Sequence, residues 1–301
     1  MKYSVLFFCL FAQYVIAQIA QGPATGYVPT GVIISTDSFP ASPIKPMTPH
    51  RSNPFHRIPT IDIANEGGAA PSLSKNTSNY VIDASVSGST QIGSPTILNS
   101  FPGVPMSDTS RPFPYDANIA AGPSHLAAVV NSALRIFDKS GNSLKYIDIY
   151  NWYLHTGMPK ASNIVDPKIR YDHFAHRWIM VWIALNETAD HNPQFLPGAY
   201  FFISVSDDAN PLGTWYNWAI PSSTNGNTDA GNWADFDGVG FDKDALYITS
   251  DQISFSAGGI MYTKIRIIPK NQLLANKTDS LHWTDFWDIR NNRPCGREVI
   301  I

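Results

Sequence analysis

Four aspartates precede or begin segments with the apolar pattern of β-strands. Carboxylates repeated in this way can bind a cation or act as an acid and a base. They are Asp116, Asp166, Asp235 and Asp237. Carboxylates that converge in a fold can bind Ca²⁺, which takes about six to eight oxygen ligands. Two carboxyl groups at a set separation can also form the acid and base pair of a glycosidase. The alternative is that each aspartate caps a turn through an Asx-type hydrogen bond.

Asp235 and Asp237 are also the residues expected to bind a metal ion, and calcium is the ion considered. Asp242–Asp244 is only loosely similar to a calcium loop, because it lacks the spaced ligands and the closing glutamate of an EF-hand. His173 and His176 are three residues apart, a spacing that shares one face on a helix. Their segment is predicted to form a turn, so we expect surface histidines there and no metal site.

Other catalytic signatures are absent from the sequence. It contains no Gly-x-Ser-x-Gly motif, no P-loop and no dinucleotide fingerprint. The only glutamates are Glu66, Glu187 and Glu298, and the arginines match no sialidase pattern, which argues against a sialidase. The net charge of −3 without a basic patch excludes a typical nucleic-acid binder.

Short apolar and aromatic runs separated by turn residues predict strands throughout residues 112–301. Arg177–Ala184 is rich in β-branched and aromatic residues, which predicts a strand buried on both faces. Asp138–Asn142 is a predicted hairpin turn, and residues 271–276 are a predicted short helix. The other expected strands are residues 126–130, 134–137, 144–150, 199–205, 215–220, 245–249 and 261–268. This pattern predicts an all-β sandwich, barrel or propeller.

An approximate internal repeat favours a β-propeller. Three units, which begin at Asp116, Asp166 and Asp235, each show an acidic residue, a short apolar strand, a polar turn and a hydrophobic strand. The first two are spaced at about the 40 to 50 residues of a propeller blade, and the third spacing predicts an insertion. Residues 112–301 then make about four blades. The apolar end of the chain at Val299–Ile301 suggests an incomplete propeller, that is, a fragment.

Several motifs resemble known proteins. Pro114–His125, and Asp166–Asp172 followed by Arg177-Trp178, resemble a group of large secreted bacterial proteins that are mostly uncharacterised. Ser204–Asp208 followed by Pro211–Trp215 looks like a variant, with a longer loop, of the Asp-box turn of sialidase-type β-propellers. The resemblance covers residues 112–270 and implies a β-propeller. It does not imply sialidase activity, because Asp-box turns are structural and lie away from the central site.

The N-terminus has the features of a secretory signal peptide. Lys2 precedes an apolar run from Val5 to Ala17 that is too short for a transmembrane helix. We therefore expect residues 1–17 to be removed, with secretion to the extracellular space and no membrane insertion afterwards. Cys295 then remains alone, either as a buried thiol or with a partner outside this chain. Sequons at Asn76, Asn186 and Asn276 predict a glycoprotein in a eukaryotic secretory route.

Residues 18–111 are predicted to form a linker or stalk, and residues 112–301 the β-propeller-like domain. The chain has 23 Pro and 8 Trp. Most of the prolines precede residue 115, and every tryptophan lies at or after Trp152. Proline at this density blocks helices and central strands, so we expect an extended or disordered segment. Only residues 81–97 show a weak strand pattern.

Three functions fit these features. The first is a secreted propeller that binds carbohydrate or another cell-surface ligand, with exposed aromatic rings that stack on sugars. The second is a glycoside hydrolase, or another sugar-active enzyme, of the propeller kind. The third is a structural, adhesin-like module.

Overall fold

The computed structural model describes residues 20–40, 100–104, 116–131, 133–186 and 198–289. These residues form an almost purely antiparallel β-structure, which confirms the all-β prediction. The described helices are α1 (Ile149–His155) and α2 (Lys270–Leu273), together with a 3-10 turn at Thr36–Ser38. In the described part of the chain, no helix has the length and apolar character needed to span a bilayer.

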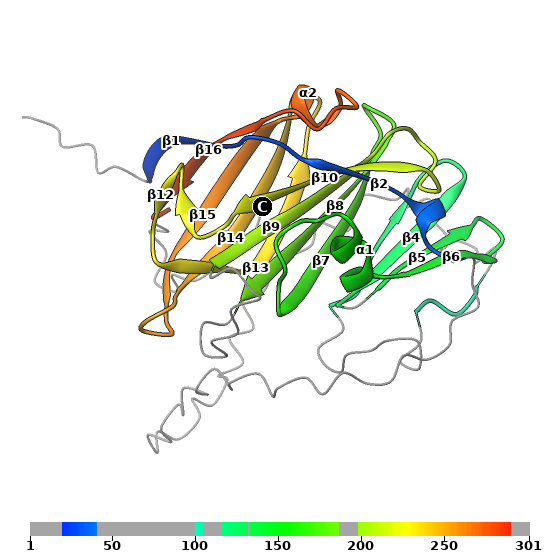
Figure 1. The fold of residues 1–301 in the computed structure, drawn as a ribbon, viewed down its shortest axis with the longest axis horizontal. Coiled ribbons are helices and arrows are strands. Elements are labelled where there is room, and N and C mark those ends of the chain that lie inside the picture. The colour runs from blue at the N-terminus through cyan, green and yellow to red at the C-terminus, as the bar shows by residue number, and fades with distance from the viewer. Residues whose placement is uncertain (1–19, 41–99, 105–115, 132, 187–197, 290–301) are drawn as a thin grey trace, which may run out of the picture.

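Three sheets follow one another along the chain and lie side by side (Figure 1). Sheet I contains β3 (Asn118–Ala121), β4 (His125–Val130), β5 (Ala133–Asp138) and β6 (Ser143–Asp148). Sheet II contains β7 (Asn163–Asp172), β8 (Arg177–Asn186), β9 (Gly198–Ser206) and β10 (Thr214–Pro221). Sheet III contains β13 (Asn232–Phe241), β14 (Ala245–Ser254), β15 (Ile260–Pro269) and β16 (Leu281–Trp287). A small hairpin of β11 (Thr224–Asn225) and β12 (Thr228–Asp229) connects sheets II and III.

The first strand of each sheet, β3, β7 or β13, lies at the sheet edge that faces the neighbouring sheets, and β7 contacts both of the others. We call these three the inner strands. Ile169 N–H donates to Asn118 Oδ1 at 2.9 Å, and Arg170 Nε donates to the Val239 carbonyl at 3.2 Å. Asp166, four residues earlier on β7, is close to Asp116 and Asp235. The three inner strands therefore run in the same direction, with their N-terminal ends together.

Sheet II is the middle layer, and strand β8 contributes to the core on both of its faces. Ile179, Val181 and Ile183 pack into the cluster shared with sheet III. Trp178 and Trp182 pack into the cluster shared with sheet I. Because side chains alternate across a strand, each of these five side chains lies in one core or the other, and all are fully buried. This confirms that Arg177–Ala184 forms a strand buried on both faces.

Residues 20–40, which we call the strap, add an outer strand to two of the sheets. Strand β1 (Gln21–Val28) pairs antiparallel with β16, and β2 (Val32–Ser35) pairs antiparallel with β10. The strap, blue in Figure 1, thus crosses the outer edges of sheets III and II. It then reaches sheet I, where the Phe39 ring stacks on Trp152 at 5.7 Å and Lys145 Nζ donates to the Phe39 carbonyl.

The prediction of an extended or disordered stalk is therefore wrong for the strap. The open edges of β10 and β16 supply the hydrogen bonds that the backbone of this segment needs. The remaining stalk residues, 41–99 and 105–111, lie outside the described residues. So do the predicted signal peptide, the strand pattern at 81–97, Asn76 and Cys295.

A buried polar network joins helix α1, sheet II and the strap. Asn217 Oδ1 accepts from Trp152 Nε1 at 3.0 Å and from Ser204 Oγ at 2.6 Å. Its Nδ2 donates to the Val32 carbonyl of the strap at 3.3 Å. The Tyr153 hydroxyl lies 3.1 Å from Ser204 Oγ. Because Asn217 is fully buried, this network holds three separate elements in one arrangement.

Candidate functional site

Each inner strand has a residue in the left-handed backbone region near its N-terminal end. Asp116 has φ 43°, Asp166 has φ 52° and Phe236 has φ 49°. The pairing register shifts between Val165 and Lys168 on β7 and between Asp235 and Gly238 on β13. These β-bulges redirect the side chains beside them. Aspartate tolerates positive φ, but a bulky aromatic residue rarely adopts it.

Asp116 and Asp166 are held together by Asn131. Asn131 Nδ2 donates to Asp116 Oδ2 at 2.6 Å, and Asn131 Oδ1 accepts from the Asp166 backbone N–H at 2.8 Å. The pKa of Asp166 is raised to about 6, first by burial and then by the charges of Asp235 and Asp116.

Asp235 and Asp237 lie on either side of the bulge in β13. Burial raises the pKa of Asp235, and the charges of Asp251 and Asp116 act in the same direction, against a backbone hydrogen bond from Phe236 that lowers it. Asp237 is completely buried, and burial raises its pKa to about 7 although Lys168 opposes the shift. Its Oδ1 lies 3.2 Å from Lys168 Nζ.

The structure therefore brings all four sequence-predicted aspartates together at the N-terminal ends of the inner strands. We call this group, Asp116, Asp166, Asp235 and Asp237, the acidic end. Their placement agrees with the prediction that they converge, while their role in binding or catalysis stays a prediction. Burial raises the pKa values of Asp166, Asp235 and Asp237, and the charges of neighbouring aspartates act in the same direction.

Phe236 is the residue of this site that sequence reasoning missed. Its side chain is 79% exposed between Asp235 and Asp237, the largest exposure of any large apolar side chain described as exposed. The only signal in the sequence was an aromatic residue between two aspartates. Strained backbone conformations cluster at functional sites, so the exposed ring of Phe236 is a candidate for contact with a ligand.

Metal binding at Asp235 and Asp237 stays a prediction. Among the residues that the structure describes, no group of three or more His, Cys, Asp and Glu is arranged to hold a metal ion. Asp237 Oδ1 forms an ion pair with Lys168. His173 and His176 also have different neighbours, since His173 packs on Phe174 and His176 lies near the Tyr171 hydroxyl. This agrees with their expected place in a surface turn.

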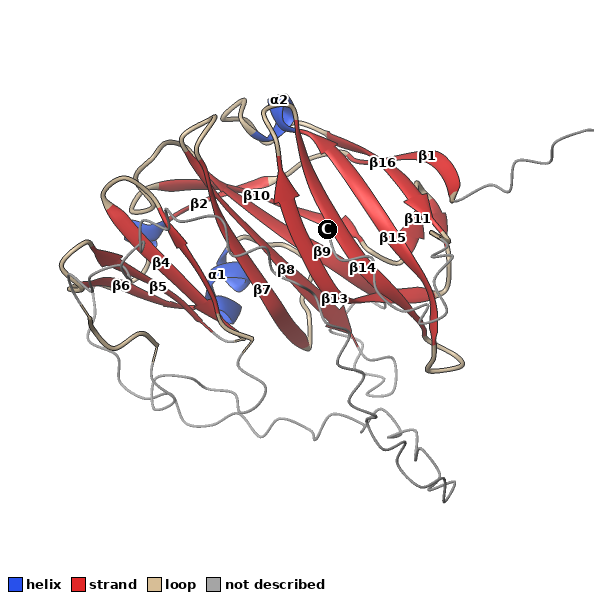
Figure 2. Cartoon of the chain, turned by 180° about the vertical axis from the view of Figure 1, so that it is seen from behind, coloured by secondary structure: helices blue, strands red, loops and turns tan. Residues whose placement is uncertain are grey.

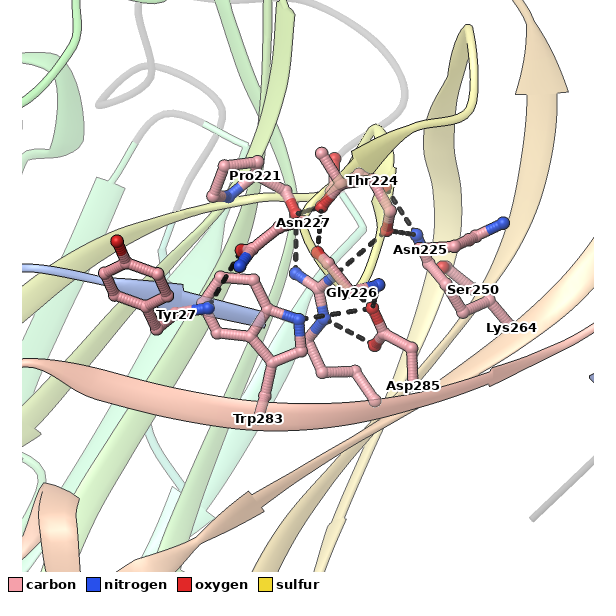
Figure 3. Close-up of polar contacts among 12 residues, drawn as sticks. Tyr27, Pro221, Thr224, Asn225, Gly226, Asn227, Ser250, Lys264, Trp283 and Asp285 are labelled. Atoms are coloured by element: carbon pink, nitrogen blue, oxygen red, sulfur yellow. Dashed lines mark hydrogen bonds and ion pairs between the residues drawn. The ribbon is translucent and has the colours of Figure 1, made fainter. Parts of the chain in front are cut away.

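A second polar cluster lies at the outer side of sheet III, under the β11–β12 hairpin (Figure 3). Arg266 donates to both carboxylate oxygens of Asp285, at 2.8 and 2.7 Å, and its guanidinium lies 4.4 Å from the ring centroid of Trp283. Asp285 also accepts from the Gly226 N–H at 2.8 Å. Lys264 Nζ donates to the carbonyls of Ser222 and Thr224, and burial lowers the pKa of Lys264 to about 7. The cluster fixes the hairpin on sheet III.

The turn that resembles an Asp-box connects β9 and β10. Asp207 N–H donates to the Thr214 carbonyl at 2.9 Å, and Trp215 Nε1 donates to the Pro211 carbonyl at 3.0 Å. Asp208 Oδ1 accepts from the Asn210 N–H at 2.7 Å. The turn thus satisfies its own polar groups, and it joins the two outer strands of sheet II rather than the inner strand β7.

Two of the three predicted glycosylation sites fall on described residues. Asn276 is exposed, with φ 53°, in the loop after α2, where its Nδ2 donates to the Asp207 carbonyl at 3.3 Å. Asn186 is the last residue of β8. Glycosylation at these positions remains a prediction.

Comparisons with known proteins give little further information. No protein-family model matches the chain, and no curated protein matches it. Among solved structures, native Bacillus subtilis arabinanase Arb43A matches with 13% sequence identity and a TM-score of 0.27. The match covers 51% of this chain and 65% of that chain. Similarity at this level supports no inference about fold or function, so the site must be interpreted from its own geometry.

Proposed function

We propose that the protein is a secreted β-propeller whose acidic end binds carbohydrate. The arrangement of the sheets supports the propeller. Each is an antiparallel sheet that begins with its inner strand, and neighbouring sheets pack face to face in chain order, as blades do. The pattern of the first 17 residues supports secretion.

The observation that supports carbohydrate binding is the exposed ring of Phe236, which lies between Asp235 and Asp237 in the bulge of β13. Sugars present apolar ring faces, which stack on aromatic side chains, and hydroxyl groups, which donate hydrogen bonds to carboxylates. Phe236 and Asp235 offer both kinds of contact on adjacent residues. The φ of 49° at Phe236 costs energy that packing does not recover, because the ring is exposed.

A glycan array followed by titration calorimetry tests this proposal. We expect the Phe236→Ala variant to bind its glycan about fivefold more weakly than the unmodified protein, because a stacked ring contributes about 1 kcal/mol. Tyr27→Ala is the matched control, since Tyr27 also has an exposed ring, at 54%, but lies on strand β1 at the outer edge. Equal affinities for the two variants would contradict the proposal.

A glycoside hydrolase at the same site is the second candidate, and the raised pKa of Asp166 favours it. A carboxyl group with a pKa of about 6 is protonated below that pH and can act as a general acid beside an ionised carboxylate. Turnover of aryl glycosides that is lost in Asp166→Asn and falls above pH 6 in the unmodified protein would establish this function. Binding without turnover would leave the first candidate.

A further inference from the structure

The segment that forms the β11–β12 hairpin lies on sheet III without an apolar anchor. Residues 222–231, which we call the hairpin segment, contain alanine and glycine but no larger apolar side chain. Polar contacts hold the segment on the sheet (Figure 3). Arg266 Nη2 donates to the Thr224 carbonyl at 3.1 Å. The Gly226 N–H donates to Asp285 Oδ2 at 2.8 Å. The docked position of the segment therefore depends on the charge of the groups beneath it.

Two positive side chains converge on one carbonyl oxygen of the hairpin segment. Lys264 Nζ donates to the Thr224 carbonyl oxygen at 2.9 Å, and Arg266 Nη2 donates to the same oxygen at 3.1 Å. Both side chains are buried. Two positive charges this close repel each other strongly when little water separates them. A charged Lys264 therefore opposes the docked hairpin.

The carboxylate of this cluster is paired with Arg266 rather than with Lys264. Asp285 accepts from Arg266 through both of its oxygens, at 2.8 and 2.7 Å. Among the described residues, no ion pair joins Lys264 to a carboxylate. Burial, followed by the charge of Arg266, lowers the pKa of Lys264 to about 7, although Asp285 opposes the shift. Lys264 is thus a buried amine without a counter-charge of its own.

The same interface contains buried polar atoms whose hydrogen-bonding capacity is unused. Ser222 Oγ, Asn225 Oδ1 and Gln252 Oε1 have no hydrogen-bond partner in the described part of the chain. Gln252 is opposite Tyr262 in the β14–β15 ladder, and the Tyr262 hydroxyl accepts from Asn225 Nδ2 at 2.9 Å. Leaving a buried polar atom without a partner is costly. Undocking exposes these atoms to water, so it recovers part of its own cost.

We propose that the hairpin segment is a proton-controlled latch, which is docked on sheet III while Lys264 is uncharged and opens more readily once Lys264 binds a proton. The uncharged amine has two hydrogens, and the carbonyls of Ser222 and Thr224 accept two hydrogen bonds from it. A proton adds a positive charge beside Arg266. In the open form, water solvates that charge.

The latch also contacts the strap. The Tyr27 N–H donates to Asn227 Oδ1 at 3.1 Å. A Cβ on Gly26 would lie 2.6 Å from the Gly226 carbonyl oxygen, so β1 and the hairpin segment are in close contact. Opening removes these contacts from β1. A proton bound at Lys264 should therefore loosen the strap on sheet III.

The direction of the pH dependence follows from the groups around Lys264. The ionisable groups on the elements packed against it are Tyr262 and Arg266 on β15, Asp285 on β16 and the exposed Asp229 on β12. Strand β14 contributes the uncharged Ser250, opposite Lys264. In the open form the pKa of Lys264 returns toward its ordinary value of 10.5. The open form then binds one more proton between pH 7 and pH 10.5, so docking strengthens by about tenfold for each pH unit in this range.

Hydrogen exchange of the full chain at pH 6, 7.5 and 9 tests the latch, with each rate corrected for the intrinsic exchange rate at that pH. We expect the protection factors of the Gly226 and Tyr27 amides to rise at least tenfold between pH 7.5 and pH 9. Lys264→Met, which cannot bind a proton, should abolish this rise. Lys264→Arg, which stays charged, should keep both amides weakly protected at every pH. Lys243→Met, at a lysine with a 76% exposed side chain, is the matched control and should retain the full rise.

Two results for the unmodified protein would overturn the latch, whether or not the Lys264 variants fold. The first is protection that stays constant from pH 6 to pH 9 or falls above pH 7, since a fall would mean that the ammonium holds the hairpin segment in place. The second is an equal rise at the amides of β8, which would show a change in global stability. A rise that persists in Lys264→Met would assign the proton to another group and would also overturn the latch.

Discussion

Individual residues at the acidic end link the charge of the site to the stability of the fold. The pKa of Asp166 in the folded protein, about 6, lies above the value of 3.8 for an unperturbed aspartate. The folded state therefore binds its proton more tightly than the unfolded state does. By linkage, stability is highest below pH 4 for this group and falls as the pH rises through 6.

Asp166→Asn should accordingly stabilise the protein at neutral pH. The amide cannot ionise, so it removes the charge whose burial the fold opposes. We expect a gain of the order of 2–3 kcal/mol at pH 7.5, and a much smaller one at pH 4. Urea unfolding at both pH values measures this difference. A variant that is less stable than the unmodified protein at pH 7.5 would show that the ionised group makes favourable contacts.

Asp285 shows the opposite case, a buried charge with a full set of partners. Asp285→Asn should destabilise the protein by about 3–5 kcal/mol, because the buried Arg266 loses its counter-charge. Thermal unfolding measures the loss. Asp244→Asn, which breaks only the exposed ion pair with Lys243, is the control and should change little. Similar effects in the two variants would contradict this assignment.

At the scale of elements, hydrophobic periodicity predicted strands well and helix α1 not at all. The predicted strand at residues 144–150 runs into the helix: β6 ends at Asp148, and residues 149 and 150 belong to α1. The bulky apolar residues of α1 resemble strand composition. The helix begins because the Asp148 side chain accepts from the Asn151 N–H at 2.9 Å, an N-cap. It persists because Trp152 and Tyr153 are buried against sheet II. Tertiary packing of this kind has no local sequence signal.

The network around Asn217 should carry much of the stability of α1 and strand β2. We expect Asn217→Leu to cost roughly 3 kcal/mol, because it leaves Trp152 Nε1 and Ser204 Oγ buried without their shared acceptor. Guanidinium unfolding provides the measurement. Asn271→Ala, at an exposed position of α2, should leave the midpoint nearly unchanged, and equal midpoints for both variants would refute the role of the network.

The acidic end could be predicted in part. The repeated aspartates and the strands after them indicated convergence, because neighbouring inner strands align their starts. Asn131, which joins Asp116 to Asp166, could not be predicted, since an isolated asparagine after a strand has many ordinary roles. Phe236 was missed because the repeat was aligned on Asp235, whereas the left-handed position on β13 belongs to Phe236. The backbone conformation at the bulge decides which residue takes the left-handed position, and it cannot be inferred from composition.

At the scale of the whole molecule, the strap contacts all three sheets. It pairs with β16 and β10 and packs through Phe39 beside sheet I. Strands β1 and β2 form the edges of their sheets opposite the inner strands β13 and β7, and Figure 2 shows β1 beside β16 and β2 beside β10. A proline-rich composition gave no indication of this, because the hydrogen-bond partners are about 180 to 260 residues away in sequence. Strand pairing at this distance cannot be predicted from a local sequence pattern.

Gly26 is the position where the strap most needs a small residue. A Cβ there would lie 2.4 Å from the indole of Trp283, which is buried. We expect Gly26→Ala to destabilise the protein by about 1–3 kcal/mol and to increase hydrogen exchange in β1. Gly259→Ala, with nothing near its added Cβ, is the control. Unchanged exchange in β1 would contradict a tight contact.

The strap also has a consequence for the order of events during synthesis. It is the first described segment to leave the ribosome, yet its partners β10 and β16 are made only after residues 214 and 281. Until β10 and β16 are made, strands β2 and β1 have no sheet edge with which to pair. Pairing of β1 is therefore a late event that requires the third sheet to be translated. In chains stopped before β16, β2 could pair with β10 while β1 would stay unpaired.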